Sequence, residues 1–234
     1  MKSGTDYSTI YDPDSDFDAW YSIASARAIV ERLAPGERLL ELGCATGLMT
    51  TLFVQAGVTV VGVDRSIRYL ERARARNLGQ ATFVESDITA HLAGDSACYD
   101  HITLCNVLHE VSNPSEILAL CRSRLRPTGL VHVTLQNPRS IHRLVALETG
   151  LIDDLLAVSS RGEAYGTLRL MPADELARLL SDADLHLLES RGIMLKPYAN
   201  DQMALLPDVV LEGLVEAARH LPDHAAINYV LAHG

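Results

Sequence analysis

The stretch that decides the fold is Leu40-Glu41-Leu42-Gly43-Cys44-Ala45-Thr46-Gly47. It completes a short apolar segment that begins at Arg38 and predicts a strand, and it leads into a segment from about Gly47 to Ala56 that predicts a helix. The glycines at 43 and 47 let the backbone turn tightly and let a ligand approach closely. Because the first N–H groups of the helix point into this turn, the loop favours a carboxylate or a phosphate.

Acidic residues follow the next two predicted strands. Residues 58–64 form a β-branched apolar run typical of a strand buried on both faces, and the run ends at Asp64. A carboxylate at this point can accept hydrogen bonds from both hydroxyls of a ribose. Residues 81–85 predict a third strand, after which Asp87 can accept from the exocyclic amine of an adenine while Ile88 packs on the ring. The sequence therefore predicts a nucleoside-containing ligand at this edge.

Strands and helices alternate along the chain, which predicts a parallel α/β sheet with right-handed crossovers. Asn113 can cap one helix, because Pro114 suits its first position and Glu116 completes a capping box. Residues 139–171 break the alternation and are interpreted as an insertion over the carboxyl edge of the sheet. The other predicted strands are residues 99–107, 130–135, 186–195 and 225–232, and the other predicted helices are residues 22–33, 66–79, 172–181 and 209–221.

The composition is that of an ordinary globular protein with an acid excess. The chain has 234 residues, of which 48% are hydrophobic and 21% charged, and a formal net charge of −10. Such acidity argues against nucleic acid as a partner, because phosphate contacts need clustered Lys and Arg. No apolar stretch is long enough to span a bilayer, and the first residues are polar and acidic, unlike an export signal. The four cysteines form no CxxC pair, so we expect no metal, no membrane partner and a cytoplasmic location.

The loop and the acids follow one another in an order that resembles the class I S-adenosylmethionine (SAM)-dependent methyltransferases. The first motif of that family is acid-x-Gly-x-Gly-x-Gly, which residues 41–47 match with Ala45 in place of the middle glycine. The dinucleotide fingerprint GxGxxG does not match. Residues 60–66, 85–88, 99–110 and 125–129 resemble the remaining motifs, the last of them the LxPGG turn before strand five.

The resemblance implies a fold and a ligand. The fold would be α/β, with a doubly wound sheet of seven mostly parallel strands, the last strand antiparallel, and a small helical cap. Residues 1–234 would form one SAM-binding domain that takes SAM as co-substrate and no metal. The residues implied to hold SAM are Gly43, Cys44 and Gly47 at the methionine portion, Glu41 at the loop or the amino group, Asp64 at the ribose, Arg65, Asp87 and Ile88 at the adenine, and Asn106 beside the sulfonium end.

Methyl transfer is an in-line displacement on a sulfonium, so the enzyme mainly aligns the acceptor and, where needed, removes a proton. His109 follows the fourth predicted strand, and an imidazole titrates near neutral pH, which makes it a candidate base; a structural histidine that caps a loop is an equal alternative. Asn137 and Tyr165 are further candidates for the reacting end. The candidates for the acceptor pocket are His142, Arg169, Tyr198 and Asn200.

Residues 137–203 are also similar to a group of bacterial small-molecule methyltransferases with the pattern N…HR…GHRRVY…LKPLPN.QM. Thr167 and Met171 depart from this pattern in the presumed substrate region, so the resemblance does not carry over that group's substrates. The matching positions are Asn137, His142, Arg143, Gly166, Arg169, Leu195, Lys196, Pro197, Asn200, Gln202 and Met203.

Residues 1–21 are interpreted as an aromatic arm. They hold five of the chain's twelve aromatic residues, namely Tyr7, Tyr11, Phe17, Trp20 and Tyr21. The resemblance implies that such an arm folds over SAM, and aromatic faces attract a sulfonium. We therefore expect Tyr7 and Tyr11 to form a mobile lid together with the cap insertion, residues 139–171. Phe17 and Trp20 are interpreted as members of a small satellite core.

The leading functional prediction is a methyltransferase that acts on oxygen or nitrogen of a small molecule, because residues 106–110 lack the (D/N)PP(Y/F) motif of base-amino methyltransferases. A second hypothesis is an enzyme of the same fold that cyclises SAM itself to azetidine-2-carboxylate and methylthioadenosine. A third is a SAM-binding module without catalysis, against which the intact motif set argues. The products formed from SAM would distinguish the three.

Overall fold

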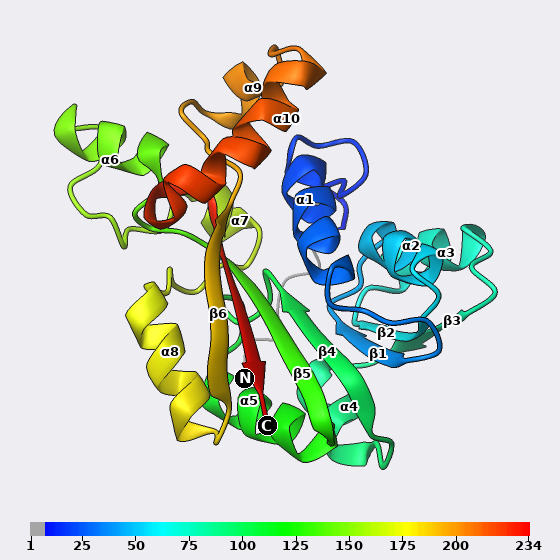
Figure 1. The fold of residues 1–234 in the computed structure, drawn as a ribbon. Coiled ribbons are helices and arrows are strands. Elements are labelled where there is room, and N and C mark those ends of the chain that lie inside the picture. The colour runs from blue at the N-terminus through cyan, green and yellow to red at the C-terminus, as the bar shows by residue number, and fades with distance from the viewer. Residues whose placement is uncertain (1–7) are drawn as a thin grey trace.

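Seven strands form one sheet in the order β3-β2-β1-β4-β5-β7-β6 (Figure 1). The computed structural model describes residues 8–234. Strands β1 to β5 pair in parallel, whereas β7 runs antiparallel to both β5 and β6. The predicted α/β sheet with its antiparallel last strand is therefore confirmed. The strands are β1 (Arg38–Leu42), β2 (Thr59–Asp64), β3 (Ala81–Glu85), β4 (Tyr99–Cys105), β5 (Leu125–Gln136), β6 (His186–Ile193) and β7 (Ile227–His233).

Helices connect the strands and cover both faces of the sheet. They are α1 (Asp18–Val30), α2 (Leu48–Gln55), α3 (Ile67–Ala75), α4 (Ile88–Gly94), α5 (Pro114–Arg124), α6 (Ile141–Glu148), α7 (Ser160–Ala164), α8 (Ala173–Asp182), α9 (Asn200–Met203) and α10 (Asp208–Ala217). Helix α5 begins where the sequence predicts, because Pro114 takes the first position and the Glu116 N–H donates to Asn113 Oδ1 at 3.3 Å. The short 3-10 helices η1 (Ala218–His220) and η2 (Pro222–His224) follow α10.

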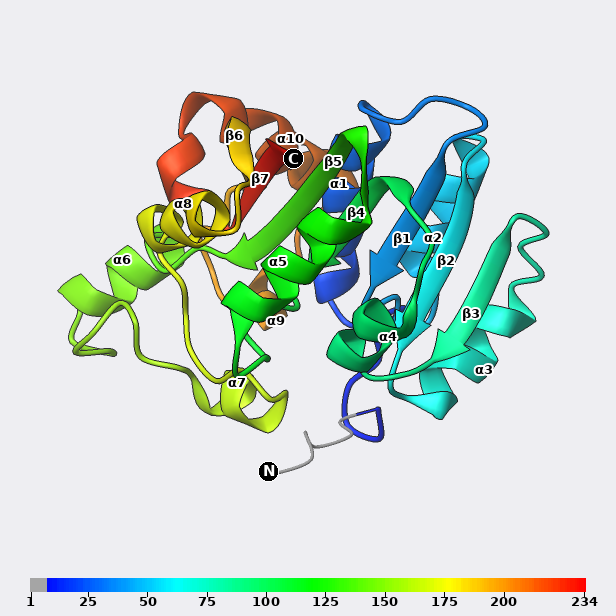
Figure 2. The ribbon, with the colours of Figure 1, turned by 90° about the horizontal axis from the view of Figure 1, so that it is seen from below.

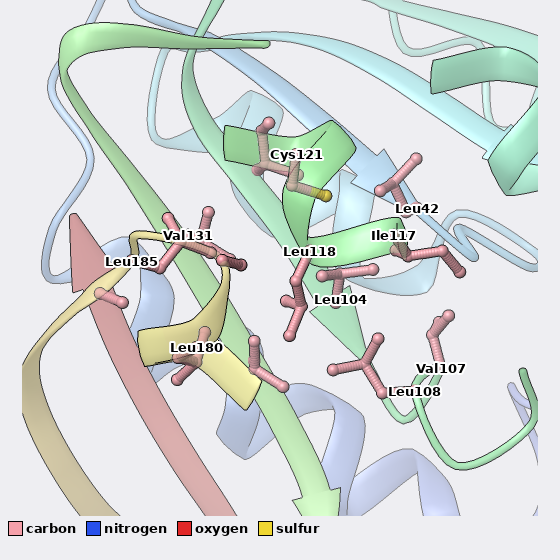
Figure 3. Close-up of a cluster of buried hydrophobic side chains, with 14 of the residues drawn as sticks. Leu42, Leu104, Val107, Leu108, Ile117, Leu118, Cys121, Val131, Leu180 and Leu185 are labelled. Carbon is pink, nitrogen blue, oxygen red and sulfur yellow. The ribbon is translucent and has the colours of Figure 1, made fainter. Parts of the chain in front are cut away.

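One hydrophobic cluster lies between the sheet and the helices α4, α5 and α8, which share one face (Figure 2). Ile117 and Cys121 are four positions apart in α5, so both face the sheet beside Leu118. They pack with Leu104 of β4 and Leu180 of α8, and all of these side chains are almost fully buried (Figure 3). Burying each such side chain stabilises the fold by about 1.5–3 kcal/mol. This face fixes β4, whose end carries part of the site.

The opposite face of the sheet is covered by α1, α2 and α10. Ile29, Phe53 and Leu211 from these helices are buried against sheet residues that include Leu39 and Tyr229. Phe17 and Trp20, near the start of α1, are partly buried and pack against this main cluster rather than forming a small satellite core. The position of α1 is therefore fixed by hydrophobic packing.

Several elements differ from the sequence-based prediction, and three of the differences have a clear cause. Helix α1 begins at Asp18 rather than at residue 22, because the aromatic residues of the arm join the core and an acid in the first turn suits a helix N-terminus. Helix α4 was not predicted, since its seven residues are too few to show a clear period. Strand β5 begins at Leu125, which pairs with Tyr99, so the stretch interpreted as a turn already belongs to the strand.

The segment of residues 139–171 contains α6 and α7 and leaves the sheet after β5 (Figure 1). Its backbone is tied to the rest of the chain: the His142 N–H donates to the Lys196 carbonyl at 3.1 Å, and the Leu168 N–H donates to the His109 carbonyl at 2.8 Å. None of the helices within residues 8–234 is both long and apolar enough to cross a membrane.

Candidate functional site

A cavity of about 500 Å³ lies at the carboxyl ends of the parallel strands and extends under the segment of residues 139–171. The structure brings most of the predicted site residues to its wall. They are Tyr11, Glu41, Gly43, Cys44, Asp64, Arg65, Asp87, Ile88, Asn106, His109, Asn137, His142, Tyr165 and Asn200. Residues that are far apart in the sequence therefore meet in one space, at the sheet edge where ligands of open α/β folds bind.

The loop after β1 has the backbone that its glycines predict. Gly43 has φ of 81°, and a Cβ built there would lie 2.6 Å from a methyl carbon of Val107. Gly47 has φ of 73° and lies close to Ala73 of α3, which places it behind the cavity wall rather than in it. Ala45 also takes a left-handed φ, 44°, in the position of the family's middle glycine. The loop thus keeps the glycine geometry with one strained alanine.

Asp64 at the end of β2 holds this loop in place. Its Oδ2 accepts from the Ala45 N–H at 2.9 Å and its Oδ1 accepts from the Ser66 N–H at 2.8 Å. Burial raises the pKa of Asp64, although the two backbone donors counteract that effect. Each carboxylate oxygen can accept a further hydrogen bond. Asp64 can therefore support the loop and receive two hydroxyls from the cavity together.

Glu41 is a buried acid beneath the loop. The Thr50 hydroxyl donates to its Oε2, and the residue is 4% exposed. Burial raises the pKa of Glu41 to about 8, with the Thr50 donor opposing and the charge of Asp64 adding to the rise. At neutral pH the carboxyl is therefore mostly protonated, and a cation that enters the cavity would favour its ionised form.

Two polar side chains from the end of β4 face the cavity without full hydrogen bonding. Asn106 has a left-handed φ of 55°, and its buried Oδ1 has no hydrogen-bond partner within residues 8–234. Nδ1 of His109 also has no hydrogen-bond partner within residues 8–234. His109 is 5% exposed, and its Nε2 lies 3.7 Å from Glu110 Oε1. Burial lowers the pKa of His109 to about 4, so the imidazole is neutral at physiological pH. A buried unpaired acceptor such as Asn106 Oδ1 is costly unless a ligand donates to it.

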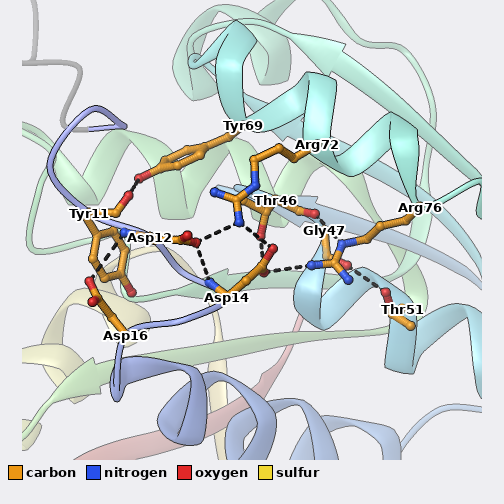
Figure 4. A network of polar contacts seen from close by, with 10 residues as sticks. All are labelled: Tyr11, Asp12, Asp14, Asp16, Thr46, Gly47, Thr51, Tyr69, Arg72 and Arg76. Atoms are coloured by element: carbon orange, nitrogen blue, oxygen red, sulfur yellow. Dashed lines mark hydrogen bonds and ion pairs between the residues drawn. The ribbon is translucent and has the colours of Figure 1, made fainter.

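An acidic strap, residues 11–16, contributes Tyr11 and Pro13 to the cavity wall. Its polar contacts with α3 and the loop after β1 are shown in Figure 4. Arg72 donates to Asp12 and Asp14 at 2.7 Å each, and Arg76 donates to Asp14 at 2.7 Å and to the Thr46 carbonyl at 2.6 Å. The Thr46 hydroxyl also donates to Asp14 at 2.7 Å. Arg72 of α3 and Arg76, which directly follows that helix, therefore fasten the strap to the loop that follows β1.

The comparisons with known proteins match this geometry. A family model described as a methyltransferase domain matches residues 19–190. The chain belongs to this family. A relative from Hahella chejuensis, a ubiquinone biosynthesis O-methyltransferase, is 29% identical over 222 residues, which cover 91% of this chain and 90% of the relative. A relative of the same name from Burkholderia pseudomallei is 26% identical over 216 residues, which cover 89% of this chain and 91% of the relative.

Solved methyltransferases share the fold. Magnesium protoporphyrin IX methyltransferase from Synechocystis PCC 6803, with bound S-adenosylhomocysteine (SAH), aligns with a TM-score of 0.59 at 15% identity over 92% of this chain and 82% of that chain. The protein is thus a SAM-dependent methyltransferase, and SAM is its co-substrate.

In this methyltransferase the strap and the cap meet over the cavity. The rings of Tyr11 and Tyr165 lie 5.0 Å apart, and Arg161 of α7 donates to Asp18 of α1 at 2.8 Å. Asn200 Nδ2 donates to Asp18 at 2.6 Å as well. These contacts join the N-terminal segment to the cap, while Tyr7 lies outside the described residues.

Two predicted acceptor-site residues lie away from the cavity. The Arg169 guanidinium pairs with Glu175 of α8 at 2.9 Å, and Tyr198 is 53% exposed. Arg169 lies beyond the turn at Gly166, which directs its side chain toward α8; the nearby cap arginine that does line the cavity is Arg161.

Asn137 lines the cavity with its side chain already engaged. Its Nδ2 donates to the carbonyls of Asp223 and Ala225, each at 2.9 Å, and its Oδ1 accepts from the Arg139 N–H at 2.9 Å. These bonds fix the turn after β5 and the start of β7, so the geometry favours a positioning part for Asn137 over a catalytic one.

Sequence reasoning missed the parts of the site that depend on tertiary contacts. Asp18 and Arg161 line the cavity as an ion pair between segments distant in sequence, and Arg72 and Arg76 fasten the strap. The available signal for the strap was the alternation of acids at 12, 14 and 16 opposite the basic face of α3.

Proposed function

We propose that this methyltransferase transfers the methyl group of SAM to oxygen or nitrogen of a small molecule enclosed in the cavity. The proposal rests on the observation that the cavity is continuous. It runs from the acids at the strand ends to the polar side chains of the cap, and the strap and the cap cover it. A volume of about 500 Å³ suits a nucleoside-sized ligand with a small neighbour.

The acids at the strand ends suit the nucleoside and the cationic parts of SAM. We assign Asp64 to the ribose hydroxyls, and Asp87 and Ile88, with Arg65, to the adenine. We assign Glu41 and the unpaired Oδ1 of Asn106 to the α-ammonium, which would supply a donor to Asn106 Oδ1 and a positive charge beside Glu41. The remaining wall at the methionine portion is the loop backbone at Gly43 and Cys44, with Gly47 shaping the loop from behind.

SAM supplies an activated methyl group, so the protein's task is alignment and proton removal. An attacking oxygen or nitrogen forms a bond to the methyl carbon, the carbon–sulfur bond breaks, and the bonding pair stays on sulfur. The acceptor's proton then needs a base. His109 lines the cavity in its neutral form because burial lowers its pKa to about 4, and its Nδ1 has no partner within residues 8–234. We assign His109 as that base and Tyr165 as a cap residue over the reacting end.

The arm, residues 1–21, and the cap insertion, residues 139–171, are proposed to act as one lid on a single SAM-binding domain. The contacts of Tyr11 with Tyr165 and of Asp18 with Arg161 support this arrangement. Exclusion of water by such a lid favours displacement chemistry. Relatives named for O-methylation in ubiquinone biosynthesis favour oxygen over nitrogen as the attacking atom.

The test is a product assay. The protein is incubated with SAM and a low-molecular-weight cell extract, and SAH is resolved from methylthioadenosine by chromatography. We expect SAH to form only when extract is present, together with one metabolite that has gained a methyl group. A His109→Gln variant should lose at least about a hundredfold in kcat. Methylthioadenosine without extract would replace the proposal by cyclisation of SAM, and the absence of both products would leave a binding module.

A further inference from the structure

The cap side of the cavity is basic, in contrast to the acidic strand ends. Lys196, which follows β6, and Arg143, on α6, both line the wall there. The Lys196 ammonium lies 5.7 Å from the centre of the Tyr21 ring and has no hydrogen bond or ion pair to any of residues 8–234. A half-buried ammonium without an acid partner is costly, because burial removes water and nothing replaces it.

Arg143 is held in place and keeps donors to spare. Its Nε and Nη2 donate to the Leu155 carbonyl at 3.1 and 2.7 Å, and Nη2 also donates to the Ala157 carbonyl at 2.7 Å. These bonds orient the guanidinium and leave Nη1 unused within the described residues. No carboxylate lies within ion-pair distance of Arg143 among residues 8–234, although the more distant charge of Asp154 partly opposes the effect of burial on the Arg143 pKa.

The charges around Lys196 show that these cations form one group. The pKa of Lys196 is lowered to about 8, chiefly by burial; Arg161 and Arg143 add to the lowering, and Asp18 and Asp201 oppose it. Asp18 is already paired with Arg161 at 2.8 Å, so it is not free to pair with Lys196. His142 beside them is neutral, because burial and the two cations lower its pKa to about 3.

We propose that Lys196 and Arg143 form a carboxylate subsite and that the acceptor of this methyltransferase is therefore a small carboxylic acid. The inference rests on the proposed function and names its substrate class. The free ammonium and the single free nitrogen Nη1 match the two oxygens of one carboxylate. The subsite lacks the additional donors that a phosphate takes, since the other guanidinium nitrogens already serve carbonyls. Ala146 and Ile152 line the same end of the cavity and suit an apolar body attached to the acid.

The arrangement also orients the two ligands. Glu41 and Asp64 lie at the end of the cavity that suits the cationic parts of SAM, and Lys196 lies at the opposite end. An acceptor anchored by its carboxylate at the cap would present its other end toward the strand ends, where His109 lies. Anchoring at a distance from the reacting atom is a common way to reduce the entropy cost of the displacement.

The chain offers a direct probe, because Lys2 and Lys196 are its two lysines. Protein labelled with [13C]lysine gives two side-chain signals by NMR, and loss of one in Lys196→Met assigns the other. We would titrate the signal with pH in the SAH complex, alone and with acetate, benzoate, benzamide or inorganic phosphate. SAH alone should leave the pKa of Lys196 at about 8. Benzoate should raise it by about one unit or more, and benzamide should not move it.

Affinity gives the second readout. Benzoate should bind the SAH complex of Lys196→Met about tenfold or more weakly than that of the wild type. Arg139→Met, which removes an exposed cation of the same cap segment outside the cavity, should bind benzoate like the wild type. SAM and SAH affinity should be unchanged in Lys196→Met.

Four results would overturn the proposal. The first is a Lys196 pKa raised by SAH alone, which would assign the subsite to the carboxylate of SAM. The second and third are equal effects of benzoate and benzamide on this pKa, and a larger effect of phosphate on it than of acetate or benzoate. The fourth is an unchanged affinity of Lys196→Met for benzoate. The product assay is independent of this titration. An enzyme that makes methylthioadenosine yet binds benzoate through Lys196 would refute methyl transfer and keep the subsite.

Discussion

The buried carboxyl of Glu41 predicts that SAM binding releases a proton. Burial raises the pKa of Glu41 to about 8, with Thr50 opposing and Asp64 adding to the rise, so at pH 7 about nine tenths of the free protein carries the proton. An α-ammonium placed beside Glu41 favours the carboxylate, and each unit by which the pKa falls corresponds to about 1.4 kcal/mol. SAM binding at pH 7 should therefore release about 0.9 proton, and affinity should rise about tenfold from pH 6 to pH 7.

The assay is calorimetric titration of SAM in two buffers that differ in ionisation enthalpy, below pH 7.5 so that the ammonium of SAM itself stays charged. The direction of the pH dependence follows from the raised pKa of Glu41, because the protein without SAM holds this proton up to about pH 8 and the complex with SAM releases it. Affinity should therefore rise with pH throughout this range. Glu41→Gln can keep the hydrogen bond from Thr50 but cannot ionise, so it should release no proton. Proton release that persists in Glu41→Gln, or is absent in the wild type, would refute the placement of Glu41 at the ammonium.

Three further predictions concern the loop, the strap and the sheet. Ala45→Gly should raise the free energy of unfolding in urea by about 0.5–1 kcal/mol, because glycine relieves the left-handed φ of 44°. Arg76→Ala should speed SAM dissociation several-fold in stopped-flow fluorescence, because it removes one of the two arginines that hold Asp14 of the strap, whereas Arg68→Ala at an exposed position of α3 should not. His132 is fully buried and burial holds its pKa well below 6.5, so the unfolded chain takes up its proton first. His132 should therefore contribute about 1.4 kcal/mol per pH unit to the loss of stability below pH 6.5, and the loss should be less steep by that amount in His132→Gln.

The sequence predicted those parts of the fold whose cause is local. Residues 58–64 are apolar on both faces because β2 lies inside the sheet, and the run ends where Asp64 meets the loop. Gly43 and Gly47 lie where a left-handed backbone is required. Asn113 and Pro114 mark a helix start by hydrogen-bonding chemistry alone. In each case the residues nearby in the sequence are enough to predict the local structure.

The parts of the site that the sequence did not predict depend on contacts between distant segments. Asp14 is 62 residues from Arg76, and Asp18 is 143 residues from Arg161, so no local period reveals either pair. The sequence predicted Arg169 and not Arg161 as an acceptor-pocket residue, whereas the structure places Arg161 at the cavity and Arg169 beside Glu175 of α8. The environment of a side chain, which sets its charge and its partners, is a tertiary property.

The central claim is that Asp64 lies in the SAM site at the carboxyl end of β2. Calorimetric titration of SAM against Asp64→Ala tests it, with Glu85→Ala as the control, because Glu85 is the exposed acid paired with Asp64 on the adjacent strand and lies outside the cavity. Loss of the charged acceptor should weaken binding by about 1.5–3 kcal/mol, or roughly tenfold to hundredfold, while Glu85→Ala binds like the wild type. A folded Asp64→Ala variant that binds SAM with unchanged affinity would contradict the account.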